Sequence, residues 1–149
     1  MKKAIESKKA PAAIGPYSQG IKMGDFLFCS GQIGVSPKTN VLVSGGIKQE
    51  TKQAFMNLGA VLKEAGADFD TVVKVNVYLA NMDDFPVMNE IYATFFKNPY
   101  PARATVEVAR LPKGAQFEIE CIAYINCPPS HKASEGEREC CGEDCCRNS

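Results

Sequence analysis

Arg103 and Glu120 are the two side chains of this sequence whose types and settings best suit chemistry on a small carboxylic acid. A guanidinium group binds a carboxylate through two parallel hydrogen bonds, and Arg103 follows Pro101-Ala102 at the entrance to an expected strand. Glu120 lies in an apolar strand, where glutamate is uncommon and a partly buried carboxyl can serve as a general acid or base. Either residue alone is more often a solvated side chain, so the interpretation depends on their joint placement.

Four further residues could complete a site around this pair. Tyr17 lies in a Gly-Pro-Tyr-Ser loop, where an aromatic ring can close a pocket or simply pack at an edge. Ser30 and Gly31 could present backbone N–H groups to an anion because glycine permits close approach, or they could form an ordinary turn. Asn89 lies beside the apolar stripe of an expected helix, where the alternative is a surface asparagine.

Charge and histidine content argue against several classes of function. The 149 residues include 17 basic and 17 acidic side chains, so the basic excess of a nucleic-acid binder is missing and no nucleic-acid partner is favoured. His131 is the only histidine and lies in the C-terminal tail, so no Ser–His–Asp or Cys–His constellation can be drawn within the domain. Covalent serine or cysteine catalysis is therefore not expected.

The sequence predicts no membrane partner. A spanning helix needs about 20 apolar residues, and no such run occurs. The lysine-rich stretch 1–13 lacks the apolar core of a secretory signal. We therefore expect a cytoplasmic protein.

Hydrophobic periodicity indicates the elements that must position the candidate residues. Apolar steps of three and four residues predict a helix from Ile47 to Ala65, ended by Gly66, and a second helix over 85–96. Runs of β-branched and aromatic residues predict the strands Gln19–Met23, Phe26–Ser30, Val72–Leu79, Ala104–Val108 and Phe117–Ile125, with Val41–Val43 as a short addition. The expected fold class is α+β, a single domain with one mixed β-sheet and two helices on one face, in the order ββαβαββ.

Side-chain alternation assigns the strand residues to the two faces of this sheet. The face expected to meet the helices carries Val73, Val75, Val77, Leu79, Phe117, Ile119, Cys121, Ala123 and Ile125. The opposite face is expected to carry Asn76, Tyr78, Thr105, Glu118, Glu120, Ile122 and Tyr124. Because two helices cannot cover both faces, we expect this partly apolar second face to pack against another subunit, with its carboxylates lining a cleft between subunits.

The seven cysteines divide the chain into a domain, 1–126, and a tail, 127–149. Cys29 and Cys121 lie in apolar strands, where a reduced cysteine behaves as a small hydrophobic residue. The Cys140–Cys146 cluster could ligate Zn²⁺ or Cu⁺ or form disulfides. The polar composition around it favours a disordered tail with incidental or regulatory thiols, and acylation of a cysteine is a further alternative.

Four stretches of the sequence occur together in one known family. They are Gly15-Pro16-Tyr17-Ser18-Gln19, Ser30-Gly31-Gln32-Ile33, residues 101–114 and Glu118-Ile119-Glu120. In this order, over roughly residues 3–126, they closely resemble the RidA (YjgF) family of reactive-intermediate deaminases. The stretch from Arg103 to Glu120 is the most specific part of the resemblance.

The resemblance implies a chorismate-mutase-like fold and a homotrimer with active sites between subunits. It also implies hydrolysis of 2-imino acids, such as 2-iminobutanoate and 2-iminopropanoate, to 2-keto acids and ammonia, without a metal or an organic cofactor. Arg103 would bind the carboxylate, and Glu120 would position the water and transfer its proton. The substrate-binding residues would be Tyr17, Ser30, Gly31, Asn89 and Thr105, the last of which stands where many members carry cysteine.

Two other functions stay open at this point. An endoribonuclease or translation inhibitor is an activity also ascribed to this family, and the near-zero charge counts against it. A non-catalytic binder of small acids, or a chaperone-like trimer, would share the same fold and assembly.

Overall fold

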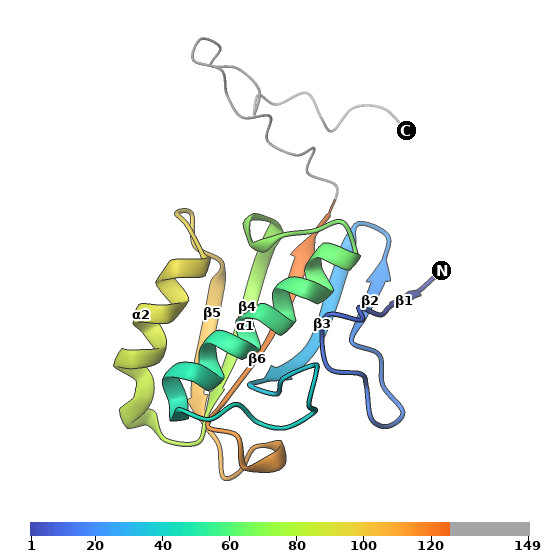
Figure 1. Cartoon of the computed structure of the whole chain (residues 1–149). Coiled ribbons are helices and arrows are strands. Elements are labelled where there is room, and N and C mark those ends of the chain that lie inside the picture. The colour runs from blue at the N-terminus through green and yellow to red at the C-terminus, as the bar shows by residue number, and fades with distance from the viewer. Residues whose placement is uncertain (126–149) are drawn as a thin grey trace.

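One mixed β-sheet carries two α-helices on the same face in the computed structural model, which describes residues 1–125 (Figure 1). The strands are β1 (Lys3–Ile5), β2 (Gly20–Met23), β3 (Phe26–Ile33), β4 (Val72–Leu79), β5 (Ala102–Glu107) and β6 (Phe117–Tyr124). The helices are α1 (Gly46–Glu64) and α2 (Phe85–Phe95), with short 3-10 turns η1 (Phe69–Thr71), η2 (Met82–Asp84) and η3 (Pro112–Gly114). The predicted α+β class is confirmed. The expectations for the tail, 127–149, lie outside the described residues.

The last strand lies in the middle of the sheet. The strand order is β1-β2-β3-β6-β4-β5, and every neighbouring pair is antiparallel except β4 and β5. The parallel pair is joined through α2, as a crossover connection requires. Glu120 on β6 is therefore central, whereas Arg103 on β5 lies on an edge strand.

Several details differ from the sequence-based expectations. β1 adds an edge strand that was not predicted, because three residues give too little alternation to read, so the order becomes βββαβαββ. Val41–Val43 is not a strand, and it forms an isolated bridge between Val35 and Leu42 instead of a ladder. β3 continues past Ser30 to Ile33, across a register shift between Cys29 and Gln32.

A second register shift corrects the expected orientation of Val73. The pairing of β4 with β6 slips between Val72 and Lys74, which adds one residue to β4 at this point. Val72 is consequently buried, at 6% exposure, and Val73 is 45% exposed. From Val75 onward the predicted alternation holds.

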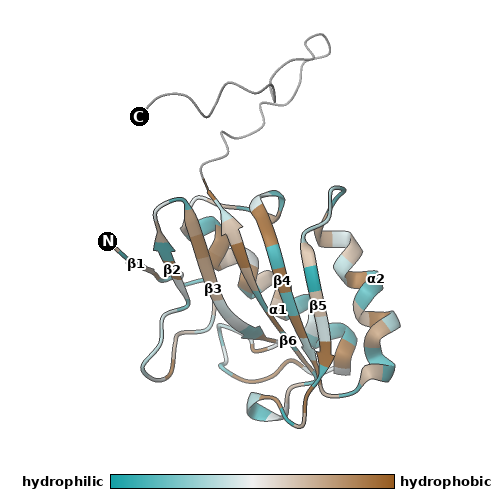
Figure 2. Ribbon diagram, turned by 180° about the vertical axis from the view of Figure 1, so that it is seen from behind, coloured by the Kyte–Doolittle hydropathy of each residue, from teal (hydrophilic) through white to brown (hydrophobic). Residues whose placement is uncertain are grey.

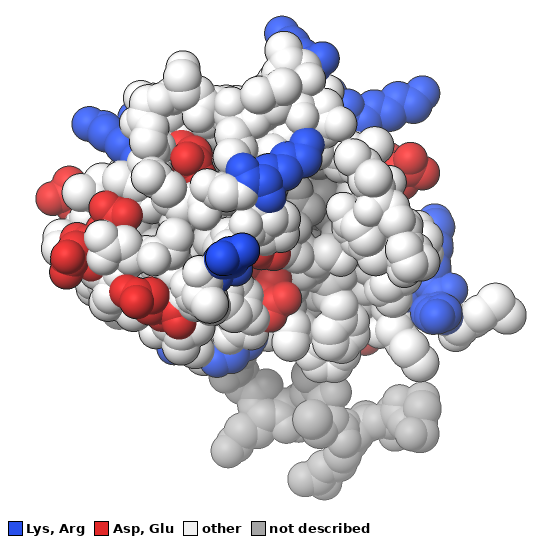
Figure 3. Space-filling model, turned by 90° about the horizontal axis from the view of Figure 1, so that it is seen from below, with Lys and Arg blue, Asp and Glu red and all other residues white. Residues whose placement is uncertain are grey.

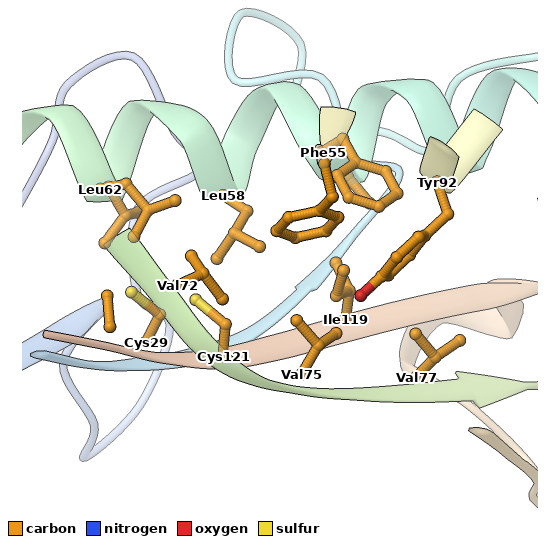
Figure 4. Close-up of a cluster of buried hydrophobic side chains, with 14 of the residues drawn as sticks. Cys29, Phe55, Leu58, Leu62, Val72, Val75, Val77, Tyr92, Ile119 and Cys121 are labelled. Atoms are coloured by element: carbon orange, nitrogen blue, oxygen red, sulfur yellow. The ribbon is translucent and has the colours of Figure 1, made fainter. Parts of the chain in front are cut away.

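The core lies between the sheet and the two helices (Figure 4). Phe55 of α1 is fully buried and stacks on Phe95 of α2 with ring centroids 4.4 Å apart. Asn57, also fully buried, donates hydrogen bonds to the carbonyls of Ile33 and Val35 and so holds α1 to the end of β3. Neither helix of the described part is long and apolar enough to cross a membrane.

The two internal cysteines face each other in this core. Cys29 of β3 pairs directly with Cys121 of β6, and both side chains are buried beneath α1 (Figure 4). A hydrogen bond to Cys29, followed by burial, raises the pKa of the Cys121 thiol far above its ordinary value. The pair therefore behaves as a small apolar contact, as the sequence predicted.

Candidate active site

Glu120 is held in place by two side chains from the neighbouring strand β4. Asn76 Nδ2 and the Tyr78 hydroxyl each donate to Glu120 Oε1 over 2.9 Å. Asn76 pairs directly with Glu120 in the sheet, and Tyr78 lies two residues further along the same face. Both donors approach one oxygen, so Oε2 keeps its capacity to accept a hydrogen bond from a water.

A pocket of ≈ 550 Å³ opens beside this carboxylate. Tyr17, Ser30, Gly31 and Glu120 all line it, so four of the predicted site residues come together within one chain. Ser30 is fixed from the N-terminal side, because its hydroxyl donates to the Ser18 carbonyl over 2.6 Å and its backbone N–H donates to the Gln19 carbonyl over 2.9 Å. Tyr17 is 53% exposed at the pocket wall.

The wall at Ser30 and Gly31 is formed by the irregularity in β3. The pairing register of β3 with β6 breaks between Cys29 and Gln32, so neither Ser30 nor Gly31 has a direct partner on β6. A bulge of this kind leaves backbone groups without ladder partners and re-aims the strand, and bulges are frequent next to active sites. The sequence singled out these two residues but did not reveal the bulge.

Arg103 belongs to a different cluster, between β5 and α2. Its Nη1 donates to Asn89 Oδ1 over 2.9 Å, and its guanidinium lies 4.5 Å from the ring centroid of Tyr92 and 5.5 Å from that of Phe85. Aromatic faces attract a cation and restrict how it can turn. No carboxylate within residues 1–125 pairs with Arg103, so the guanidinium can still receive an anion.

The two clusters lie on opposite faces of the sheet. Arg103 pairs with Val75, which faces the helices, and Glu120 pairs with Asn76, which faces away from them. Thr105 pairs with Val77 and therefore lies on the helix side, so its expected position on the uncovered face was wrong. Its hydroxyl is buried without a hydrogen-bond partner in the described part of the chain.

The electrostatics of the two clusters follow from these contacts. The hydrogen bond to Glu120, followed by burial, raises the pKa of Tyr78, so its hydroxyl keeps the proton that it donates. Burial raises the pKa of Tyr92 to about 12, against the opposing charge of Arg103. Both tyrosines are therefore neutral at physiological pH. Among residues 1–125, no group of three or more His, Cys, Asp or Glu side chains is arranged to hold a metal ion.

The face of the sheet that no helix covers, which Figure 2 shows from behind, carries exposed apolar side chains. Phe26, Phe28 and Tyr124 are exposed by 45%, 47% and 39%, and the rings of Phe26 and Tyr124 meet edge to face at 5.2 Å. Val106 on β5 is 45% exposed. Large apolar side chains grouped in this way on one surface are typical of a face that binds another protein surface.

Comparison with known proteins identifies the family. The family model described as endoribonuclease L-PSP matches residues 7–125, a range that includes every candidate site residue. The chain belongs to this family, the RidA family. The mouse protein named 2-iminobutanoate/2-iminopropanoate deaminase is 52% identical over 123 residues, which cover 83% of this chain and 91% of that protein.

Solved structures give the same result for the fold. A structure from Thermotoga maritima described as a putative endoribonuclease has a TM-score of 0.81 and 45% identity, covering 83% of this chain and 98% of that one. The structure of E. coli TdcF with bound serine has a TM-score of 0.78 and 39% identity, covering 82% and 98%. The sheet with two helices on one face is thus the RidA fold.

Three parts of this candidate site were missed by sequence reasoning. Asn76 and Tyr78 were placed on the correct face, but their bonds to Glu120 were not foreseen, although the alternation along β4 and β6 could have suggested them. The contact of the Tyr92 ring with the guanidinium of Arg103 was not expected either. Lys113 lines the pocket and donates to the Asn40 carbonyl over 2.9 Å, a contact between distant loops for which the sequence carries no signal.

Proposed function

We propose that this chain hydrolyses reactive 2-imino acids, such as 2-iminobutanoate and 2-iminopropanoate, to 2-keto acids and ammonia. The observation that carries the proposal is the hydrogen-bonded Glu120 on the wall of a pocket lined by Tyr17, Ser30 and Gly31. It occurs in a chain that is 52% identical to a mouse protein named for this activity. The bound serine in the related TdcF structure also favours a ligand of amino-acid size and type.

Glu120 would prepare the attacking water. An α-imino acid presents an electrophilic carbon next to a carboxylate, and attack by water forms a carbinolamine that breaks down to a keto acid and ammonia. Because Asn76 and Tyr78 fix one oxygen of Glu120, the other can orient a water and accept its proton. No cofactor enters this scheme.

Arg103 would hold the substrate carboxylate. The bond to Asn89 and the ring of Tyr92 restrict the guanidinium, so little further ordering is needed when an anion binds. β5 is an edge strand, so backbone N–H groups near Thr105 that point away from β4 are available as further donors. Asn89 and Thr105 would then act beside Arg103 on one side of the substrate.

The site would be assembled from two copies of the chain in a homotrimer. Arg103, Asn89 and Thr105 lie on one face of the sheet, and Glu120 lies on the other, so one chain cannot present both groups to one small substrate. The exposed apolar side chains beside Glu120 favour packing of a neighbour there. The trimer, like the cytoplasmic location and a role in controlling metabolite damage, stays a prediction.

Imine hydrolysis by the wild type beside Arg103→Ala tests the proposal. A dehydratase acting on serine or threonine generates the imine, and release of the keto acid is followed with and without the purified protein. We expect the wild type to accelerate release and Arg103→Ala to lose the effect, while Arg110→Ala, which removes an exposed arginine outside the pocket, behaves as the wild type. Equally slow release by the wild type and Arg103→Ala would show that the assignment is wrong.

An endoribonuclease is the second candidate, because the matched family and the Thermotoga structure carry that description. At the end of the molecule that carries η3, acidic and basic side chains both occur, without the continuous basic patch that binds the phosphate backbone of RNA (Figure 3). RNA cleavage that is lost in Glu120→Ala would favour this second function. Cleavage that survives both Glu120→Ala and Arg103→Ala would place it outside the proposed site.

A further inference from the structure

Glu118 is a second carboxylate on the pocket wall, and the proposed function does not use it. It precedes Glu120 by two residues on β6, so both side chains project from the same face of the sheet. Both line the ≈ 550 Å³ pocket with Tyr17 and Gly31, and Glu118 is half-buried. Strand neighbours flank it closely, because it pairs with Ile33 of β3 and with Tyr78 of β4.

The Glu118 carboxyl lies directly against the backbone at Gly31. A β-carbon added to Gly31 would collide with Glu118 Oε1 and would lie 2.9 Å from its Cδ. The lack of a side chain at position 31 therefore leaves the space that the carboxyl group occupies. The bulge in β3 and the carboxyl of Glu118 thus form one wall of the pocket.

The surroundings of Glu118 differ from those of Glu120. Glu120 accepts two hydrogen bonds, whereas Glu118 has no hydrogen-bond donor and no cation paired with it within residues 1–125. Tyr78 pairs with it from β4, and the titratable groups that line the pocket with it are Glu120 on its own strand, Tyr17, and Lys113 of η3, whose Nζ donates a hydrogen bond to the Asn40 carbonyl. Burial, followed by the charge of Glu120, raises the pKa of Glu118.

We propose that Glu118 is the proton donor that releases ammonia, while Glu120 takes the proton from the attacking water. This assignment rests on the proposed function. It gives the two proton transfers to two carboxyl groups: Glu120 accepts hydrogen bonds from Asn76 and Tyr78, and Glu118 has no hydrogen-bond donor within residues 1–125. Two neighbouring carboxyl groups whose surroundings give them different pKa values commonly serve as the acid and the base of one reaction.

The protons and electrons balance over one turnover. Water adds to C2 of the iminium, its proton passes to Glu120, and the electron pair of the C=N bond moves to nitrogen to give a neutral carbinolamine. Glu118 then protonates the amine, and the C–N bond breaks as the carbinolamine hydroxyl returns its proton to Glu118 and becomes the keto oxygen. Ammonia leaves and takes the proton stored on Glu120. The net reaction is iminium plus water to keto acid plus ammonium.

Glu118→Gln tests the assignment, because the amide keeps the shape of the side chain but cannot donate a proton as an acid. We expect kcat for imine hydrolysis to fall about 10²-fold at pH 7 while KM changes less than about twofold. Wild-type kcat should decline as pH rises through the raised pKa of Glu118 and the acid loses its proton, and Glu118→Gln should lack this decline. Glu118→Asp should keep the decline, and Glu90→Gln, an exposed glutamate on α2, should match the wild type.

Two results would overturn the assignment. One is a Glu118→Gln protein with the kcat and pH profile of the wild type. The other is a loss of activity in Glu118→Gln with the wild-type decline in kcat still present, because a wall residue without a proton-transfer role would act in that way. If the wild type itself left imine lifetimes unchanged, the proposed function would fail instead, so the two failures are distinguishable.

Discussion

Mixed oligomers of two inactive variants give the most demanding test of the divided site. Arg103→Ala removes the carboxylate-binding group from the helix side of β5, and Glu120→Ala removes the carboxylate from the uncovered face of β6. Each variant alone should be inactive. If every site takes Arg103 from one copy and Glu120 from its neighbour, an oligomer that contains both variants regains sites in which both groups are intact.

The expected magnitude follows from counting. In a random equal mixture, the copy that contributes the arginine is intact half of the time, and so is the neighbour that contributes the glutamate, so about one quarter of the sites are complete. If each site were contained in one chain, this mixture would have no complete sites. Wild type mixed with the double variant is the control, because it yields about one quarter of wild-type sites if they are shared and about one half if they are not.

The assay is imine hydrolysis after co-refolding of equal amounts of the two variants. Size-exclusion chromatography verifies that the mixture has the same oligomeric state as the wild type. Activity near a quarter of wild type would support the divided site. A mixture as inactive as its components, together with half activity in the control, would refute the reasoning that opposite faces of the sheet require two copies.

Three further predictions concern single residues. Tyr78→Phe removes one of the two donors to Glu120 and should lower kcat about tenfold, or ~1.4 kcal/mol, with KM within about twofold; an unchanged kcat would show that Asn76 alone suffices. Phe55→Ala removes a fully buried ring and should lower the free energy of unfolding by about 3–5 kcal/mol. Urea denaturation at fixed protein concentration measures this loss, and a loss below about 1 kcal/mol would contradict the observed packing of Phe55. The pKa of Glu118 is raised in the folded state, so its contribution to stability is present at low pH and is lost as pH rises through its ordinary value of 4.5 and above. The thermal midpoint of Glu118→Gln should therefore exceed that of the wild type at pH 7 and match it near pH 3.5, and a lower midpoint at pH 7 would contradict the burial cost.

Much of the fold could be predicted because its signals are local. The apolar steps of α1 and the alternation of β6 come from residues close in sequence, and they correctly placed Glu120 on the face away from the helices. The family motifs then brought Tyr17, Ser30 and Gly31 to the same site, and the structure does place these three around one pocket with Glu120.

The errors come from long-range pairing. Thr105 was assigned to the wrong face because alternation along β5 does not reveal how that strand registers with β4. Val73 was misplaced because one extra residue before Lys74 reverses the alternation, and a bulge has no composition of its own. The separation of Arg103 from Glu120 likewise depends on the position of β5 and β6 on either side of β4.

The facing thiols of Cys29 and Cys121 have a consequence for measuring motion. Both are buried at the junction of β3, β6 and α1, and the raised pKa of Cys121 keeps it as an unreactive thiol while the sheet is closed. A thiol reagent could reach them only when these strands separate. In a variant whose other five cysteines are replaced by serine, the labelling rate would therefore measure rare opening at the centre of the sheet, where β3 pairs with β6, the strand that carries both pocket carboxylates.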